Sequence, residues 1–178
     1  AWAVDHEYTF ATFLTTTEET AKIYNTYREL AKEKSLREPG PDRFGHMCLV
    51  YVADTDEEAE REGQQLLWYL EDVVPAGFWT PPGYGSPQAF AKFGLKGRNR
   101  KGKWEDVMER GIVIAGSPDT VARKIKDLYE KTGLGHLAMM MRVGHMKHES
   151  TLKSMKLFAE EVCPQIKELG ESAESLAN

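Results

Sequence analysis

The sequence predicts an α/β fold in which about three βα units surround a parallel β-sheet. Four apolar runs favour β-structure, at residues 8–14, 46–52, 112–115 and 136–143. They are apolar throughout rather than alternating, which is typical of strands covered by helices on both faces. Helical segments separate them, and strands that alternate with helices form βαβ units with parallel strands and right-handed crossovers.

Two helices are predicted to begin at capping boxes. Thr16 and Glu19 have this spacing after the first strand, and Thr55 and Glu58 have it after the second. In a capping box the Thr hydroxyl accepts a hydrogen bond from a free N–H group of the first helical turn. We expect one apolar face of each helix to be buried: Ile23, Tyr27 and Leu30 in the first, and Ala59, Gly63, Leu66, Leu70 and Val73 in the second.

Two further helices follow the third and fourth strands. Ser117 is the expected N-cap of the first of them, with Pro118 in its first turn and Gly133 as its stop. The last helix is expected from about Thr151, and Pro164 should kink or end it because proline lacks the N–H group of a helical hydrogen bond. The expected buried faces are Val121, Ile125, Leu128 and Tyr129, and then Leu152, Met155, Phe158, Ala159 and Val162.

Residues 75–110 break this alternation. They hold Pro75, Pro81 and Pro82, six glycines and no clear periodicity. Long irregular segments inside compact domains are commonly functional, so we expect a lid-like insertion within a single domain spanning residues 1–178. Residues 170–178 are small and polar, and we expect a flexible tail there.

Composition excludes several classes of protein. The chain has 41% hydrophobic and 29% charged residues and a formal net charge of −5, so it is neither disordered nor a basic nucleic-acid binder. No apolar run approaches the roughly 20 residues of a membrane span. The two cysteines, Cys48 and Cys163, lie in no metal-ligand or disulfide pattern, and we expect free thiols in a reducing, cytoplasmic setting.

Three polar positions are candidates for ligand contacts. The turn before Ser117 leads from a strand into a helix N-terminus, which is either a plain cap or a phosphate site. Arg142 follows an apolar strand and must reach solvent, an ion-pair partner or an anionic ligand. His145 is expected to line a pocket. It lies three residues before His148, but a third metal ligand at suitable spacing is missing, so we expect no metal.

Three stretches carry a family resemblance. They are residues 2–29, which contain YTFATFL; residues 44–60, which contain Phe44-Gly45 and LVYVADTDEEAE; and residues 116–166, from GSPDTV to EEVCPQI. Together they resemble the C-terminal half of the luciferase-like flavin-dependent monooxygenases. The resemblance implies a (β/α)₈ TIM barrel with an insertion, reduced FMN or deazaflavin as cofactor, O₂ and a small organic molecule as substrates, and a flavin reductase as electron source.

The resemblance also assigns candidate site residues. The end of the sixth barrel strand lies beside the flavin ring in this family, which implies cofactor contacts at Thr12, Phe13 and Leu14, although Phe13 could equally be core. Trp79 in the insertion is the candidate lid residue, with Arg142 and His145 in the substrate pocket. The catalytic residues are expected upstream of residue 1. Positions 47–49 lack the Arg-x-His of sulfonate-type members, which disfavours a sulfonate substrate.

The chain is too short for the whole barrel. A closed barrel takes about 250 residues, so we expect a fragment that holds strands six to eight and lacks the first five. Its open sheet edges should favour homo-oligomers. Two alternatives stay open: a catalytically silent luciferase-like partner subunit, and a stand-alone α/β module that binds an anion at the Ser117 helix.

Overall fold

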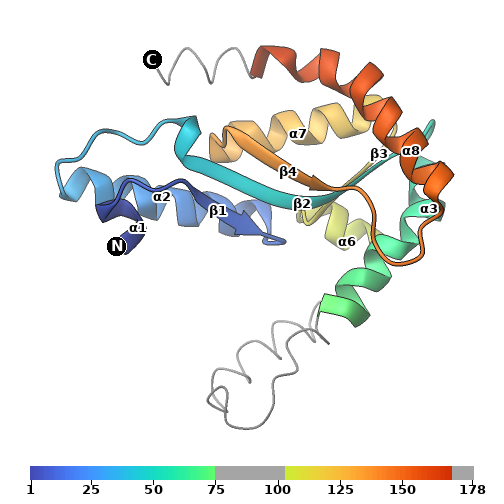
Figure 1. Ribbon diagram of the computed structural model, residues 1–178, viewed down its shortest axis with the longest axis horizontal. Coiled ribbons are helices and arrows are strands. Elements are labelled where there is room, and N and C mark those ends of the chain that lie inside the picture. The colour runs from blue at the N-terminus through green and yellow to red at the C-terminus, as the bar shows by residue number, and fades with distance from the viewer. Residues whose placement is uncertain (75–102, 170–178) are drawn as a thin grey trace, which may run out of the picture.

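The computed structural model describes residues 1–74 and 103–169 (Figure 1). All four predicted strands are present: β1 (Phe10–Phe13), β2 (Phe44–Val52), β3 (Val113–Gly116) and β4 (His136–Met140). The helices are α1 (Trp2–Asp5), α2 (Thr17–Glu33), α3 (Asp56–Trp68), α6 (Trp104–Glu109), α7 (Pro118–Thr132) and α8 (His148–Leu157). A 3₁₀ turn, η1 (Pro41–Arg43), precedes β2, and π-helical turns follow α3 and α8 as η2 (Tyr69–Val73) and η3 (Phe158–Val162).

β2 is the central strand, and its three partners are parallel to it. The carbonyl of Met47 accepts the N–H of Leu14, and the N–H of Leu49 donates to Ile112 O. Residues two apart point their backbone groups to the same edge, so β1 and β3 lie end to end along one edge of β2. Phe44 O accepts from Gly135 on the opposite edge, where β4 pairs. Among the described residues, the outer edges of β1 and β4 have no strand partner.

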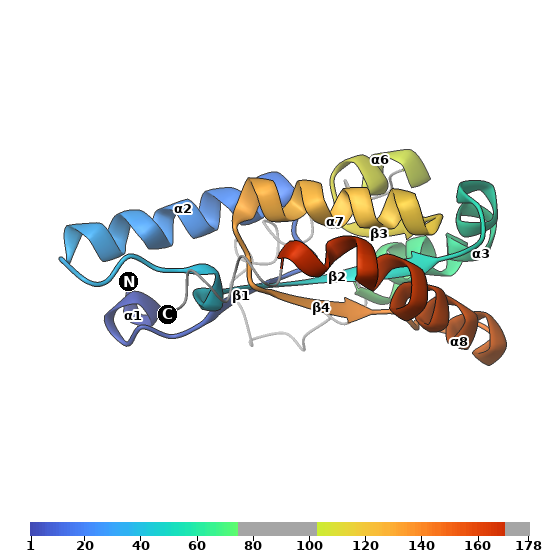
Figure 2. The ribbon, with the colours of Figure 1, turned by 90° about the horizontal axis from the view of Figure 1, so that it is seen from above.

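The sheet separates two apolar clusters. Even-numbered residues of β2 pack with α2 and α7, which run along one side of the sheet (Figure 2). Odd-numbered residues in the second half of β2 pack with α3 and α6 on the other side. On this second side of the sheet, no described helix packs against the first half of β2. Core members of the first cluster include Tyr24, Phe44, Cys48, Val50 and Ile125, and those of the second include Leu49, Tyr51, Leu66, Trp104 and Val107.

The predicted starts of α2, α3 and α7 and the predicted stop of α7 are confirmed, whereas α8 begins at His148, before the expected Thr151. Thr16 Oγ1 accepts the N–H of Glu19 at 3.1 Å, and Thr55 Oγ1 accepts the N–H of Glu58 at 3.2 Å. Gly133 ends α7 in the left-handed conformation, with φ 64° and ψ 31°. Ser117 is the N-cap of α7, but its side chain makes no capping bond.

The predicted inner faces of α2 and α3 were partly wrong. Ile23 is 37% exposed, whereas Thr20 and Tyr24 are buried. An apolar-only pattern overlooks Thr20, whose hydroxyl lies 2.7 Å from that of Thr15 beneath the helix. Val73 is exposed because the π-helical turn η2 is wider than an α-helical turn and shifts the following residues around the axis.

The predicted inner face of α8 was wrong at three positions. Leu152 is 51% and Met155 49% exposed, and Ala159 is exposed as well. Thr151 and Ser154 face the sheet instead. The reason is a hydrogen bond: Ser154 Oγ accepts the N–H of Val52 at 2.8 Å, just beyond the end of β4. The polar side chain of Ser154 therefore pairs with a backbone N–H group on the part of β2 that β4 does not reach.

Pro164 does not end the last helix, because residues 163–169 continue it. The π-helical turn η3 lies immediately before Pro164, and the helix bends there (Figure 1). A π-turn re-registers the backbone hydrogen bonds where proline cannot donate one. Of the two outcomes predicted for Pro164, the structure has the kink.

The two outer strands are less buried than their sequences predict. Phe13 is 49% exposed. In β4, His136 and Ala138 are exposed and Met139 and Met140 are half-buried. Apolar composition alone does not show which strands are central. Within the expected insertion, residues 104–109 form α6, a helix too short to give a periodic signal. Trp79, residues 75–102 and the tail 170–178 lie outside the described residues.

None of the described helices is both long and apolar enough to cross a bilayer.

Candidate functional site

The carboxyl ends of β1 and β4 flank the middle of β2. Phe13 is in register with Met47, and Ala138 is in register with the same residue from the other side. In parallel α/β sheets, ligands bind at the carboxyl ends of the strands. This end of the sheet is therefore the candidate site.

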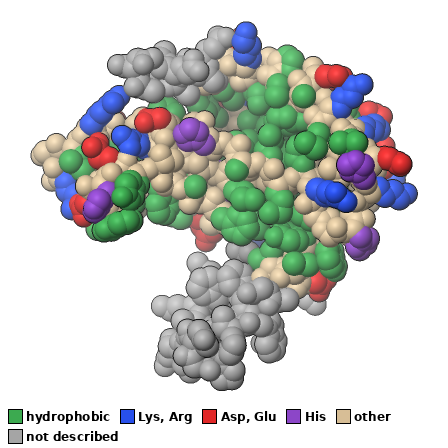
Figure 3. All heavy atoms as spheres, viewed as in Figure 1, with side chains coloured by type: hydrophobic (Ala, Val, Ile, Leu, Met, Phe, Trp, Pro, Cys, Tyr) green, Lys and Arg blue, Asp and Glu red, His purple; other side chains and the backbone are tan. Residues whose placement is uncertain are grey.

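One face of the sheet is partly exposed at this point: Phe13 and Ala138 are exposed, Met47 and Met140 are half-buried, and Gly45 is buried. Side chains on one face of a parallel sheet come from residues in register, and we call this set the open face: Ala11, Phe13, Gly45, Met47, His136, Ala138 and Met140. Hydrophobic side chains gather across the middle of the molecule in Figure 3, where Figure 1 shows β2 and β4. A Cβ at Gly45 would lie 3.4 Å from that of Ala11 and 3.5 Å from that of His136. Small residues thus make a flat floor beside Phe13.

Only one of the three predicted cofactor contacts lies on the open face. Phe13 is exposed there. Thr12 is buried on the opposite, helix-covered face, because neighbouring strand residues alternate. Leu14 is buried in the cluster with α3 and adopts a left-handed φ of 49°. Because successive side chains of a strand point to opposite faces, the sequence alone could have placed Thr12 and Phe13 on different faces.

Thr12 belongs to a buried polar network. Its Oγ1 lies 2.7 Å from His46 Nδ1, 3.2 Å from the hydroxyl of Tyr24 and 3.3 Å from that of Thr20. Tyr24 donates in turn to the carbonyl of Gly45. His46 Nε2 is buried with no partner among the described residues. Burial lowers the pKa of His46 to about 4, so the imidazole is neutral at pH 7.

The loop after β4 carries the two predicted pocket residues. Arg142 is exposed and makes no hydrogen bond or ion pair within the described part of the chain, so the alternative of a structural ion pair is not seen. His145 is exposed, and its ring lies edge-on to Trp68, with centroids 5.7 Å apart and planes at 61°. Sequence reasoning missed Trp68, because no pattern links the end of α3 to this loop.

The N-terminus of α7 already holds a carboxylate. Asp56 Oδ1 accepts the N–H of Ser117 at 2.6 Å, and Oδ2 accepts the hydroxyl of Thr120 at 2.9 Å. The backbone N–H of Ser117 is the main cause that lowers the pKa of Asp56. Asp56 therefore occupies the position of an external phosphate and would repel one. No group of three metal-ligating side chains occurs among the residues described.

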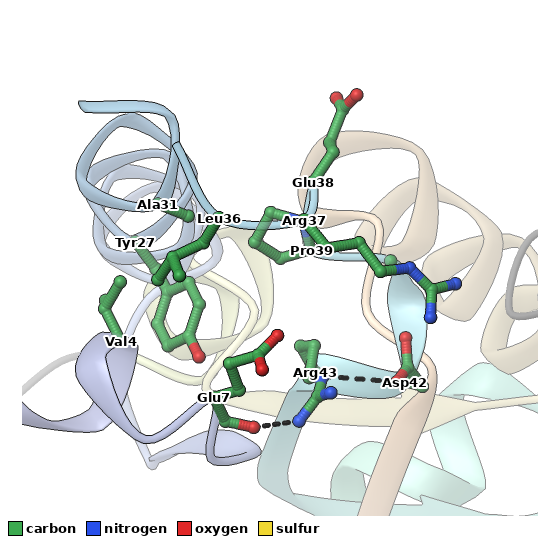
Figure 4. Close-up of a pocket in the computed structure, with 11 residues that line it drawn as sticks. Val4, Glu7, Tyr27, Ala31, Leu36, Arg37, Glu38, Pro39, Asp42 and Arg43 are labelled. Carbon is green, nitrogen blue, oxygen red and sulfur yellow. Dashed lines mark hydrogen bonds and ion pairs between the residues drawn. The ribbon is translucent and has the colours of Figure 1, made fainter. Parts of the chain in front are cut away.

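A shallow hollow lies at the opposite, amino end of the strands (Figure 4). Val4, Tyr27 and Leu36 line its apolar side. Arg37 and Arg43 both line it, and the guanidinium of Arg43 donates to the carbonyl of Glu7 and lies 3.4 Å from an Asp42 carboxylate oxygen. Arg43 directly precedes β2, so this hollow is remote from Phe13 and Arg142 along the strands.

Comparisons with known proteins identify relatives of the chain. The profile of the family described as "Luciferase-like monooxygenase" matches residues 1–136. The match ends at the start of β4, so it includes the first two resembling stretches and only part of the third. The 3,6-diketocamphane 1,6-monooxygenase of Pseudomonas putida is 30% identical over 132 residues, which is 71% of this chain and 33% of that protein.

Solved structures share the fold. The oxygenating constituent of 3,6-diketocamphane monooxygenase from Pseudomonas putida, in complex with FMN, has a TM-score of 0.66 and 22% identity over 92% of this chain and 44% of its own. A monooxygenase from Streptomyces bottropensis has a TM-score of 0.64 and 19% identity, covering 92% of this chain and 43% of its own. The coenzyme F420 dependent tetrahydromethanopterin reductase of Methanopyrus kandleri has a TM-score of 0.52 and 17% identity, covering 86% and 44%.

The chain spans a third of the length of the curated relative and less than half of each of these structures.

Proposed function

Because the chain belongs to the luciferase-like monooxygenase family, we propose that it is the C-terminal part of a flavin-dependent monooxygenase. The whole protein would insert one oxygen atom from O₂ into a small organic substrate, with electrons delivered by a separate flavin reductase. The relatives named as monooxygenases support this reaction class.

The proposal includes a partial barrel. In it, β1, β2 and β4 are neighbouring strands of a (β/α)₈ barrel, and the open face is part of its lumen. The unpaired outer edges of β1 and β4 support this, since exposed edges are normally covered or closed. The greater length of the solved relatives also supports it. The same edges favour self-association of the chain when it is isolated.

The open face fits one part of a flavin and not another. The flat floor at Gly45 and the exposed ring of Phe13 suit a planar, apolar-faced ring system. The described residues provide no site for a flavin phosphate at α7, because Asp56 fills it. We therefore assign the ring wall to this chain and the phosphate site to a part of the protein outside it.

Reduced FMN and a reduced deazaflavin both fit this ring wall, and relatives in complex with FMN or dependent on coenzyme F420 support both. When bound, the reduced flavin supplies electrons, and FMN also activates O₂. This chain's residues would bind and orient. Phe13 would pack against the ring, and the apolar floor would exclude water. Arg142 and His145 would hold a carbonyl or anionic oxygen of the substrate, and a small apolar ketone suits this lining, as the name of the curated relative supports.

One observation carries the proposal: Phe13 is exposed at the carboxyl end of β1, on a face that no described helix covers at that point. The test is a titration of the protein that contains this chain with reduced FMN and with a reduced deazaflavin. Micromolar binding of either supports the proposal, and binding of neither contradicts it. Phe13→Ala should weaken binding, whereas Phe10→Ala, at the amino end of the same strand, should not.

A further inference from the structure

Trp68 joins two segments that lie far apart in the sequence. It is the last residue of α3, and the π-helical turn η2 begins at the next residue. Its ring lies against the loop that follows β4, edge-on to His145. Helical turns of this π type are frequent at functional sites.

The loop beneath Trp68 is tightly fixed. Val143 and Met146 are buried on either side of its tip, and Met146 N–H donates to Val143 O at 3.2 Å. Between them Gly144 has φ 53°, a left-handed conformation that suits glycine. A Cβ on Gly144 would lie 2.5 Å from Cζ3 of Trp68. The backbone therefore approaches the indole as closely as glycine allows.

In this arrangement one side of the His145 imidazole contacts Trp68 and the other side faces solvent. Trp68 covers one side of the imidazole, and the residue as a whole is exposed. Arg142 and Lys147 lie in the same loop and are exposed too. A histidine flanked by two cations presents hydrogen-bond donors to an oxygen that carries negative charge.

We propose that Trp68 and Gly144 are positioning residues that fix the imidazole of His145 at the carboxyl end of the sheet, where it donates a hydrogen bond to an anionic or carbonyl oxygen of the ligand. The role as ligand donor rests on the function proposed above. The fixed geometry of the Trp68–His145 pair does not, and it is tested separately.

The first experiment is proton NMR of the histidine rings in the 178-residue chain. The indole ring current should displace the His145 resonances from those of a free histidine. Trp68→Phe should keep part of this shift, since a smaller aromatic ring remains, and Trp68→Leu should abolish it. Gly144→Ala should also abolish it, because the added Cβ drives the indole away.

The matched control is Trp2→Leu. Trp2 lies 4.7 Å from His6 between ring centroids, at the other end of the molecule. This variant should move the His6 resonances and leave those of His145 unchanged. A His145 shift that persists in Trp68→Leu overturns the positioning role. If Trp68→Leu lacks a cooperative melt, the milder Trp68→Phe decides, and a His145 shift equal to that of the unaltered chain overturns the role.

The second experiment supplies the complete protein with reduced FMN and O₂ and then with the curated relative's class of substrate, a bicyclic ketone. His145→Phe, which has no hydrogen-bond donor, and Trp68→Leu should both raise the apparent KM for the ketone by about twofold to tenfold. The first loses the hydrogen bond and the second loses the aromatic contact that positions the imidazole. If the flavin binds but neither variant changes KM, the donor role alone is overturned. Binding of neither FMN nor a deazaflavin refutes the proposed function, while the NMR result still decides the positioning role.

Discussion

The hydroxyl of Thr12 lies 2.7 Å from Nδ1 of His46, in the layer between the sheet and α2. The two residues are in register on neighbouring strands. Tyr24 joins them from α2, so one buried network ties the helix to both strands. Because burial lowers the pKa of His46 to about 4, its imidazole is neutral in this network at pH 7.

Acid should therefore destabilise the fold through His46. Its folded-state pKa of about 4 is below the ordinary 6.5, so the unfolded chain takes up a proton first as the pH falls. Stability is fully present above pH 6.5 and is lost between pH 6.5 and 4, by up to about 1.4 kcal/mol per pH unit. Urea unfolding across this range measures the slope. His46→Gln should lose this slope, and an equal slope in the variant would refute the assignment.

The Asp56 carboxylate should stabilise the start of α7. Asp56→Ala removes the acceptor for Ser117 N–H and for the Thr120 hydroxyl, and should cost about 1 kcal/mol, as for the loss of a helix cap. Because the folded pKa is lowered, this contribution is present above the ordinary value near 3.8 and is lost as the pH falls through the folded value. Thermal melts at pH 7 and pH 3 measure both effects. Asp127→Ala on the exposed side of α7 is the control, and an equal loss there would contradict the account.

Gly63 is required by the Trp104 ring. A Cβ at this position of α3 would overlap the indole. Gly63→Ala should therefore lower the free energy of unfolding by about 1–3 kcal/mol through overpacking, although alanine is the better helix former. Gln64→Ala, on the next residue, should stay within about 0.5 kcal/mol. A stabilised Gly63→Ala variant would show that Trp104 does not pack on α3.

The inner face of α8 can be tested by a pair of substitutions. Ser154→Ala leaves the buried N–H of Val52 without its acceptor and should cost about 1–3 kcal/mol. Leu152→Ser changes an exposed side chain and should cost less than about 0.5 kcal/mol. Denaturant unfolding compares the two variants. The reverse order would mean that the apolar side of α8 packs on the sheet, as the sequence alone suggests.

Local sequence patterns predicted the helices and strands. They could not predict contacts between residues that lie far apart in the sequence. Thr16 and Thr55 start their helices where the capping boxes place them, because a cap depends on residues three apart. The inward positions of Thr20 and Ser154 were missed because each bonds to a group on another element. The contact between Trp68 and His145 depends on how α3 and the loop after β4 pack, and neither segment alone carries a signal for it.

The central claim is that the carboxyl end of the sheet, rather than the hollow at its amino end, faces the flavin. Backbone amide shifts of the isotope-labelled chain during titrations with FMN and with a deazaflavin test this most directly, because they detect even millimolar binding. We predict changes at Phe13, Met47 and Arg142, and none at Glu7 or Arg43. Changes confined to Glu7 and Arg43, or none anywhere, would contradict the account.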